Sequence, residues 1–406
     1  MRSAFVFVFL SGLIFYNYRC FTSTFDDPIF QATIGVVSIL ALVIGLLTLI
    51  RMNWVFRTGY GLSDLITNWS MGIFFGLIIS ALMVSIVFLL GDFGRLVYAV
   101  IEKISNGSML WINRSEWVGY VALFMSILPV SLFIYGMARG KYHFKVREVQ
   151  LSFSDLPKAF DGYRIVQFSD LHSGNYDRFS AMEKAAKLIQ DQQADLILFT
   201  GDWINAKSEE IVPYKELFAE MSAPDGKFCC LGNHDYGAHQ AWHNLEKYKY
   251  INEAVREHIS DMQFELLDNR NKVIARNGEA IRLIGVENWG NDPFPRKGDL
   301  DAALDGISSN EFKLLLSHDP THWDKITIDH PEHIHLTLAG HTHGAQFGIE
   351  TKRFQWSPVK YVYKRWGGLY EEKNQYLYVN RGLGFIGYAG RIGMRPEITV
   401  IELKAE

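Results

Sequence analysis

The chain has 406 residues, which suggests two or three units of ordinary domain size and excludes a mini-protein that needs disulfide bonds to fold. The net charge is −4, and the part after Gly140 is net acidic, with 32 Lys and Arg against 38 Asp and Glu, which argues against a broad nucleic-acid-binding surface. A hydrophobic content of 49% excludes a largely disordered chain.

Four uncharged apolar segments occupy the first 140 residues. They are 3–18, 28–50, 65–90 and 117–138. The last three exceed the roughly 20 residues with which a helix crosses a hydrocarbon layer of about 30 Å. The first is shorter and could be a signal peptide, but no clear small-residue cleavage site follows Tyr16, so an uncleaved span is favoured. We predict a membrane domain of about four transmembrane helices over residues 1–140.

The Lys and Arg residues near these segments predict the orientation, because they resist translocation. With four spans, both ends of the membrane domain share one side. That side would carry Arg2, Arg51, Arg57, Arg139, Lys141, Lys145 and Arg147, against Arg19, Arg95, Lys103 and Arg114 on the other. The balance favours a cytoplasmic C-terminal domain. If the first segment were cleaved or did not span, three spans would remain and the side would have to be assigned again.

From Lys141 onward, short β-rich apolar runs alternate with amphipathic stretches and Gly, Asp or Asn turns, a pattern typical of a layered α/β domain over residues 141–406. The predicted strands are 146–153, 163–168, 196–200, 227–231, 281–286, 313–316, 335–338, 376–379 and 398–403, and the predicted helices are 178–192, 209–221 and 242–260. The three cysteines, Cys20, Cys229 and Cys230, make no disulfide framework and are expected to be reduced core thiols.

Five short polar motifs follow predicted strands, at the edge where α/β sheets usually bind ligands. They read Asp170-Leu-His172, Gly201-Asp202, Gly232-Asn-His-Asp235, Ser317-His318 and Gly340-His-Thr-His-Gly344. In an extended segment, residues two apart point the same way, so each Asp-x-His or His-x-His pair could converge on one ion. Mixed carboxylate and imidazole ligands favour Mn, Fe or Zn over Ca or Mg. Each motif alone is weak, since each also fits an ordinary turn, a helix cap or a core histidine.

Taken together, the five motifs resemble the calcineurin-like metallophosphoesterase superfamily, whose pattern is Asp-x-His, Gly-Asp, Gly-Asn-His-Asp/Glu, a lone His and Gly-His-x-His. The resemblance covers roughly residues 147–403. Segments 167–172, 340–346, 380–384 and 395–397 look like its membrane-linked YkuE/YaeI-type branch, although Ala345 stands where that branch usually has glycine and Glu287-Asn-Trp289 replaces a common Asp-containing turn. The four apolar segments lie outside the resemblance, which implies that the domain following these predicted transmembrane helices is a four-layer α/β/β/α sandwich.

The resemblance also implies a dinuclear site of two divalent ions, Mn, Fe or Zn. One ion would be held by Asp170, His172, Asp202 and His343, and the other by Asp202, Asn233, His318 and His341. Asp202 would bridge the ions, which lie about 3.5 to 4 Å apart in such sites. A shared water would lose a proton near neutral pH and attack phosphorus as a metal-bridging hydroxide.

Three further residues are assigned to the substrate side. By family resemblance His234 acts on the phosphate and leaving group, and as imidazolium it could protonate the departing oxygen. Asp235 would orient and charge-match that imidazole, or would be a cap or turn residue. Arg381 could contact a phosphate, or form a surface salt bridge. His322, His330 and His333 are expected in a solvated loop, and His335 is left unassigned.

The segment 352–366 interleaves cations with aromatic residues directly after the His-x-His motif. Such a mixture suits a lipid headgroup interface, and it equally suits a loop packed on its own domain. We expect a membrane-anchored phosphoesterase acting on a lipid-linked phosphomonoester, phosphodiester or pyrophosphate, with membrane lipids as partners and no nucleic acid. A soluble phosphodiester stays open. The alternative is a metal-binding or metal-free scaffold or sensor without turnover, but such scaffolds usually lack ligands that are all present here.

Overall fold

The computed structural model describes residues 2–58, 65–237, 245–292, 294–351 and 353–406. They divide into two compact units. A helical unit comprises Met1–Ala138 with Gly387–Gly390, and an α/β unit comprises Arg139–Ile386 with Arg391–Glu406.

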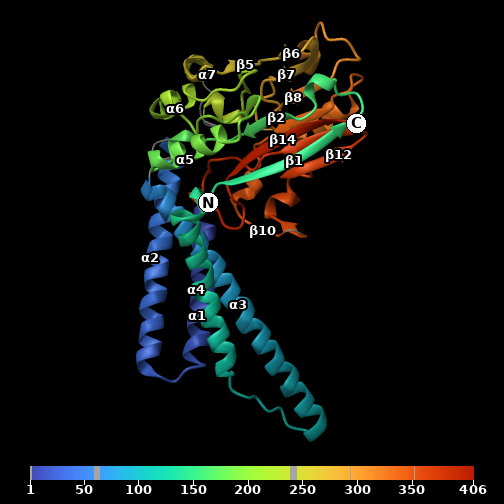
Figure 1. Ribbon diagram of the computed structural model, residues 1–406. Coiled ribbons are helices and arrows are strands. Elements are labelled where there is room, and N and C mark those ends of the chain that lie inside the picture. The colour runs from blue at the N-terminus through green and yellow to red at the C-terminus, as the bar shows by residue number, and fades with distance from the viewer. Residues whose placement is uncertain (1, 59–64, 238–244, 293, 352) are drawn as a thin grey trace. The chain divides into compact units, whose positions relative to one another are not determined.

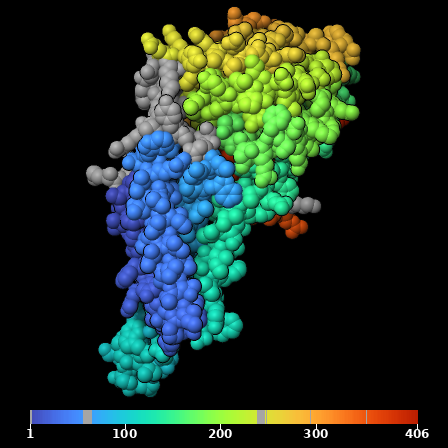
Figure 2. All heavy atoms as spheres, turned by 90° about the vertical axis from the view of Figure 1, so that its left-hand side faces the viewer, coloured from blue at the N-terminus to red at the C-terminus, as the bar shows by residue number. Residues whose placement is uncertain are grey.

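The helical unit is built from α1 (Arg2–Thr22), α2 (Pro28–Thr58), α3 (Leu65–Asn106) and α4 (Glu116–Ala138). All four are long and apolar enough to cross a membrane, as predicted. Large apolar side chains cover their outer surfaces, including Phe5 at 73% exposed, Val36 at 58% and Trp117 at 79%. The mid-blue surface in Figure 2 belongs to α2. Apolar exposure on this scale needs hydrocarbon rather than water around it.

Helix α3 is longer than a membrane is thick. Its 42 residues, at about 1.5 Å each, extend over roughly 63 Å. The uncharged part of α3 ends at Gly91, and directly after it Asp92 pairs with Arg95 and Arg114. The charged end of the helix therefore lies past the apolar span, in keeping with the cost of charge in hydrocarbon.

Two six-stranded sheets form the centre of the α/β unit (Figure 1). The strands of the first sheet are β1 (Lys145–Phe153), β2 (Tyr163–Phe168), β3 (Leu196–Thr200), β4 (Lys227–Cys230), β5 (Glu265–Leu266) and β14 (Glu397–Ala405). Those of the second are β6 (Arg270–Arg276), β7 (Glu279–Gly285), β8 (Lys313–Leu316), β9 (Leu336–Ala339), β12 (Gly368–Glu372) and β13 (Gln375–Val379). Their orders are β1-β14-β2-β3-β4-β5 and β12-β13-β9-β8-β7-β6.

Helices cover the outer faces of the two sheets. The longer ones are α5 (Phe179–Gln190) and α7 (Leu245–Asp261), and the short ones are α6 (Lys215–Ala219), α8 (Leu300–Ala303) and α9 (Thr321–Lys325). The remaining elements are a small hairpin, β10 (Ile349–Glu350) with β11 (Gln355–Trp356), and the 3-10 helices η1 (Gly140–Tyr142), η2 (Lys158–Phe160), η3 (Ser173–Asn175), η4 (Ser208–Tyr214), η5 (Asn233–Tyr236), η7 (Thr327–Asp329), η8 (His343–Gln346) and η9 (Pro358–Tyr361).

The core is divided into layers by the sheets. Ile165 and Leu198 of the first sheet pack against Leu314 and Leu338 of the second in one buried cluster, so the sheets lie face to face. On its other face the first sheet packs against α5, α6 and α7, and the second sheet packs against α8 and α9. The predicted α/β/β/α sandwich is confirmed. Cys20, Cys229 and Cys230 are buried free thiols, also as predicted.

Two predicted features differ from the structure. The helix expected over 209–221 is a 3-10 helix, η4, followed by the short α6, because Pro213 lacks the N–H that a continuous α-helix needs. His322 was expected in a solvated loop, but it lies in α9 at 1% exposed, with Nδ1 2.9 Å from Ser317 Oγ. A helical turn there places its ring on the buried side of α9.

Parallel pairing determines where the motifs meet. Strands β2, β3 and β4 are mutually parallel, and so are β7, β8, β9 and β13. Their carboxyl ends therefore lie along one edge of each sheet, and each polar motif follows one of these ends. This is the edge at which open α/β sheets bind ligands.

Candidate metal centre

The predicted ligands lie on unusual backbone. Asp170, His172, Asp202, His341 and His343 all have positive φ, between 45° and 72°. Side-chain-bearing residues rarely adopt this region, and such strain gathers at functional sites where the surroundings hold it. The extended geometry expected for Asp170-x-His172 and His341-x-His343 is therefore wrong. Left-handed turns, rather than strand alternation, bring these side chains together.

Backbone hydrogen bonds hold the strained loops against one another. The Asp170 N–H donates to the carbonyl of Gly201 at 2.9 Å, and the His172 N–H donates to that of Asp202 at 3.1 Å. Two glycines let two further loops lie close to these ones. A Cβ on Gly232 would lie 2.2 Å from Asp202 Oδ1, and one on Gly340 would lie 1.9 Å from Ser169 Oγ. Both motif glycines are thus required by space.

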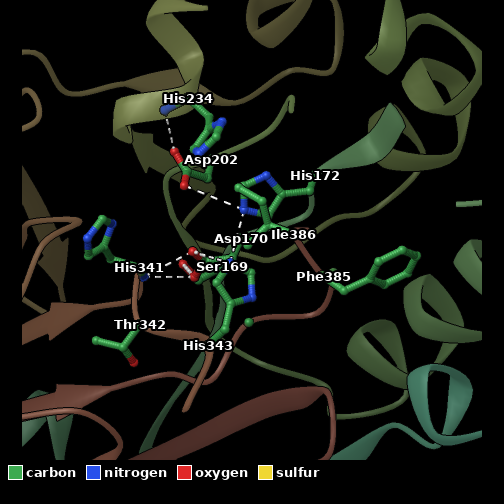
Figure 3. A network of polar contacts seen from close by, with 12 residues as sticks. Ser169, Asp170, His172, Asp202, His234, His341, Thr342, His343, Phe385 and Ile386 are labelled. Atoms are coloured by element: carbon green, nitrogen blue, oxygen red, sulfur yellow. Dashed lines mark hydrogen bonds and ion pairs between the residues drawn. The ribbon is translucent and has the colours of Figure 1, made fainter. Parts of the chain in front are cut away.

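One donor group comprises Asp170, His172 and His343, whose ligand atoms lie within 4.8 Å of one another. The Nε2 atoms of His172 and His343 are 3.0 Å apart, and His343 Nε2 is 3.3 Å from Asp170 Oδ1. All three side chains are buried. Figure 3 shows the rings of His172 and His343 near the Asp170 carboxylate, while Phe385 points away.

A second group comprises Asp202, His318 and His341. His318 Nε2 lies 3.2 Å from Asp202 Oδ2 and 3.2 Å from His341 Nδ1. Asn233 lies in the adjacent loop, with an Oδ1 that is buried and has no hydrogen-bond partner. The structure thus brings the seven predicted ligands to one edge of the sandwich.

Asp202 joins the two groups through a single oxygen. Its Oδ2 is 3.6 Å from His172 Nε2 and 3.2 Å from His318 Nε2, whereas Oδ1 accepts the backbone N–H of His234 at 2.8 Å. In Figure 3 Asp202 accordingly lies between His234 and His172. Oδ2 is therefore the atom placed to serve both groups.

The electrostatics of these donors suit divalent cations. Burial lowers the pKa of His172 to about 3 and holds the pKa of His343 well below its usual value, so both rings are neutral and present lone pairs. Burial also lowers the pKa of His341. Against the effect of burial, the carboxylates of Asp202 and Asp170 raise the pKa of His318 to about 10. A raised pKa means that His318 holds a proton beside the buried carboxylates when no other cation is present. Metal cations bound here would replace that proton and pair with the carboxylates, so the residues fit metal ions.

His234 and Asp235 do not form the pair that the sequence suggested. His234 Nδ1 lies 2.6 Å from the carbonyl of Asn205, which orients the ring. The Asp235 carboxylate instead accepts the backbone N–H groups of Asp202, Gly232 and Trp203 at 2.8 to 2.9 Å. Asp235 thus ties the two ligand loops together, and its expected contact with the imidazole is replaced by these N–H donors.

Arg381 also lies differently from the expectation. Its side chain is 1% exposed, and Nη1 pairs with Glu397 at 2.7 Å while Nη2 is 3.4 Å from Glu350. Tyr378 and Arg147 contact the same Glu397 carboxylate. The guanidinium is thus committed to a buried ion pair, and this geometry does not support a contact with substrate phosphate.

Several residues support the centre although the sequence reasoning did not select them. Asp319 and Tyr363 approach His341, with Asp319 Oδ2 3.5 Å and Tyr363 Oη 2.7 Å from Nε2. Glu210 accepts the N–H groups of Asn205, Ala206 and Lys207, and so holds the carbonyl that orients His234. Arg391 Nη2 is 3.2 Å from His343 Nδ1. Of these residues, only Asp319 had a local signal in the sequence, because it directly follows the predicted ligand His318.

Comparison with known proteins bears directly on this centre. Residues 163–345 match the family model described as calcineurin-like phosphoesterase, and residues 1–141 match that of the probable calcineurin-like phosphoesterase transmembrane domain. The metallophosphoesterase YkuE of Bacillus subtilis is 31% identical over 279 residues, which cover 67% of this chain and 90% of YkuE. The chain belongs to the calcineurin-like phosphoesterases.

Two other relatives have more specific names. Phosphodiesterase YaeI of Escherichia coli is 28% identical over 59% of this chain and 82% of its own. The UDP-2,3-diacylglucosamine pyrophosphatase LpxG of Chlamydia trachomatis is 26% identical over 66% of this chain and 92% of its own. As a member of this family, the protein is a metal-dependent phosphoric ester hydrolase and an integral membrane protein.

Proposed function

We propose that this calcineurin-like phosphoesterase uses two divalent ions, Mn, Fe or Zn, to hydrolyse a phosphodiester or pyrophosphate bond in a lipid-linked substrate. The observation that carries the proposal is the convergence of two buried donor groups on Asp202 Oδ2. Asp170, His172 and His343 would complete one ion site with Asp202, and Asn233, His318 and His341 would complete the other. The orphaned Asn233 Oδ1 supports the second site, because a buried amide oxygen without a partner is costly.

Two ions in these sites would neutralise the phosphoryl oxygens of the substrate and lower the pKa of a shared water, which supplies the nucleophile. The chain's own residues would supply the remaining steps. Because Nδ1 of His234 lies 2.6 Å from the carbonyl of Asn205, this nitrogen donates a hydrogen bond to it, which leaves Nε2 for the substrate. As the imidazolium, His234 would stabilise the departing oxygen and return a proton to it.

The lipid-linked substrate is inferred from the membrane unit and from the name of one relative. We propose residues 1–140 as a membrane domain and 141–406 as the catalytic domain, supported by the division into compact units near Ala138. A domain tethered to the bilayer meets lipids at high effective concentration. The Lys and Arg distribution supports a cytoplasmic catalytic domain. LpxG, 26% identical to this chain, is named for a pyrophosphate bond in a diacylated substrate.

The first test is hydrolysis of bis(p-nitrophenyl) phosphate and p-nitrophenyl phosphate by the detergent-solubilised full chain with added Mn²⁺. We expect turnover that needs the metal, is lost in Asp202→Asn, and falls by about 10²-fold or more in His234→Ala while its metal content is retained. His143→Ala, which alters an exposed histidine outside the centre, is the matched control and should leave the rate unchanged.

The outcomes separate the proposal from its alternative. The diester-to-monoester rate ratio ranks the bond type, and a lipid-linked pyrophosphate in mixed micelles then tests the substrate class. Equal catalytic efficiency on soluble and lipid-linked esters would contradict the lipid assignment. A folded protein that binds two ions per chain and turns over none of these esters would instead be the metal-binding scaffold.

A further inference from the structure

The segment that follows His341 and His343 contains a short hairpin and a 3-10 helix. Strand β10 pairs with β11 in a short hairpin, and η9 continues from Pro358 to Tyr361 (Figure 1). Ser357 caps η9, its Oγ accepting the Val359 N–H at 3.3 Å. We call residues 353–364 the interfacial loop.

The tip of the interfacial loop exposes large apolar side chains. Tyr361 is 74% exposed and Val362 is 76% exposed, and Phe354 in the hairpin turn is 55% exposed. Ile349, just before the turn, is 53% exposed. Adjacent apolar residues exposed to this degree mark a surface that binds a partner or a membrane.

The charge of the same loop is entirely positive. Residues 353–364 contain three Lys and Arg and no Asp or Glu. Lys360 Nζ lies 5.3 Å from the centre of the Tyr361 ring. The Lys364 side chain is 66% exposed, and its Nζ lies 3.8 Å from Asp324 Oδ1 and 3.8 Å from Glu372 Oε2, at the rim of the loop. Aromatic rings beside cations suit the headgroup region of a bilayer, where the rings meet the acyl boundary and the cations meet lipid phosphates.

The interfacial loop is also joined to the metal centre. Ser357 Oγ donates to the carbonyl of Gly344 at 2.8 Å, next to His343 in the chain. Tyr363 Oη lies 2.7 Å from His341 Nε2, one residue after the exposed Val362. The exposed tip and two proposed metal ligands thus belong to one connected structure.

We propose that the interfacial loop binds the surface of a bilayer that contains anionic lipids. Tyr361, Val362 and Phe354 enter the boundary between headgroups and acyl chains, and the cations contact lipid phosphates. The occupant is a membrane rather than a protein because the same chain is anchored in one and because the loop lacks any acidic residue. Its role in presenting a lipid ester to the metals rests on the proposed function, whereas its binding to lipid does not.

The test is the depth of a nitroxide at Val362→Cys in the full chain, reconstituted in nanodiscs of phosphatidylcholine with phosphatidylglycerol. The three native cysteines are buried, so labelling is confined to the introduced site. The matched control is Val273→Cys on β6, an exposed valine of the same unit at 43%. We expect the label at 362 to be relaxed more by oxygen than by a water-soluble nickel chelate, and the label at 273 to show the reverse.

A second measurement links the loop to turnover. Tyr361→Ser with Val362→Ser should lower the rate on a lipid-embedded ester about tenfold and leave the soluble diester rate unchanged, since only access to the bilayer is lost. A label at 362 as accessible to the nickel chelate as that at 273 would overturn the proposal. If the label is buried in lipid but no ester is hydrolysed, the loop assignment stands and the proposed function fails.

Discussion

Asp319 and Tyr363 contact His341 on the side away from the other proposed ligands. Asp319 is 1% exposed, and its Oδ2 has no hydrogen-bond partner apart from this approach at 3.5 Å. A carboxylate behind a ligand histidine fixes the tautomer and raises the basicity of the ring nitrogen that binds metal. Asp319 is therefore a positioning residue for the second ion site.

Asp319→Asn should weaken metal binding by roughly 10- to 100-fold while the protein stays folded. The measurement is the metal content of purified protein after equilibration with graded free Mn²⁺ in a chelator buffer. Asp324→Asn is the control, because Asp324 pairs at the surface with Arg365 and Lys364. Metal affinity equal to that of the unsubstituted protein would show that Asp319 has no part in the centre.

At this scale the residue types were predictable and their partners were not. The seven candidate ligands could be selected because each follows an apolar run in a known order. The Gly232 N–H that Asp235 accepts is the local turn contact that the sequence left open, whereas its other partners, Asp202 and Trp203, lie about 30 residues earlier, and no local pattern points to them. From the sequence, Arg381 could contact a phosphate or form an ion pair. The choice depends on Glu397 and Glu350, which come near Arg381 only in the folded chain.

Helices α3 and α4 approach each other closely where a glycine allows it. A Cβ on Gly76 would lie 3.2 Å from the backbone of Val130, near Pro129 of α4. Small residues at such crossings let helix backbones pack together in a membrane, where no hydrophobic effect drives association. The contact is therefore a specific requirement of the helical unit.

Gly76→Val should force α3 and α4 apart and lower the apparent Tm of the detergent-solubilised protein by several degrees, since overpacking costs about 1 to 3 kcal/mol. Gly94→Val, in the same helix, is the matched control, because a Cβ there meets nothing within 4 Å. Thermal unfolding and size-exclusion profiles of the two variants give the comparison. Equal stability of both would mean that the α3–α4 crossing tolerates a wider spacing.

The most buried strands were predicted with their observed bounds, whereas an exposed edge strand was missed. β2, β3 and β8 have their predicted bounds, and nearly every residue in them is buried, so each appears in the sequence as a continuous apolar run. β6 is an edge strand whose residues are mostly exposed, and it was not predicted. An exposed edge strand carries polar side chains on both faces, so it lacks the periodicity on which the prediction depends.

For the molecule as a whole, stability should depend on the metals. Ions that bind the folded state and not the unfolded chain stabilise it by about 2.7 kcal/mol when present at 100 times their Kd. Removing them also leaves the buried carboxylates of Asp170 and Asp202 with the protonated His318 as their remaining counter-charge.

Chelation should therefore lower the apparent Tm of the full chain, and added Mn²⁺ should restore it. Differential scanning fluorimetry with and without a chelator measures this shift. The Asp202→Asn variant should show little shift, because it lacks the oxygen that joins the two donor groups. A shift of the same size in that variant would place the stabilising ions elsewhere.

The sequence by itself determined the four apolar spans, the layered α/β class and the order of the ligand motifs, because these depend on composition, on period and on short motifs, and the family resemblance of those motifs implied the sandwich. Tertiary structure alone decided that left-handed turns aim the ligands, that Asp202 serves both groups through Oδ2, that Asp235 ties two loops, and that Arg381 is buried in an ion pair. These contacts join residues far apart in the chain. They depend on the packing of loops between two sheets, which no local pattern records.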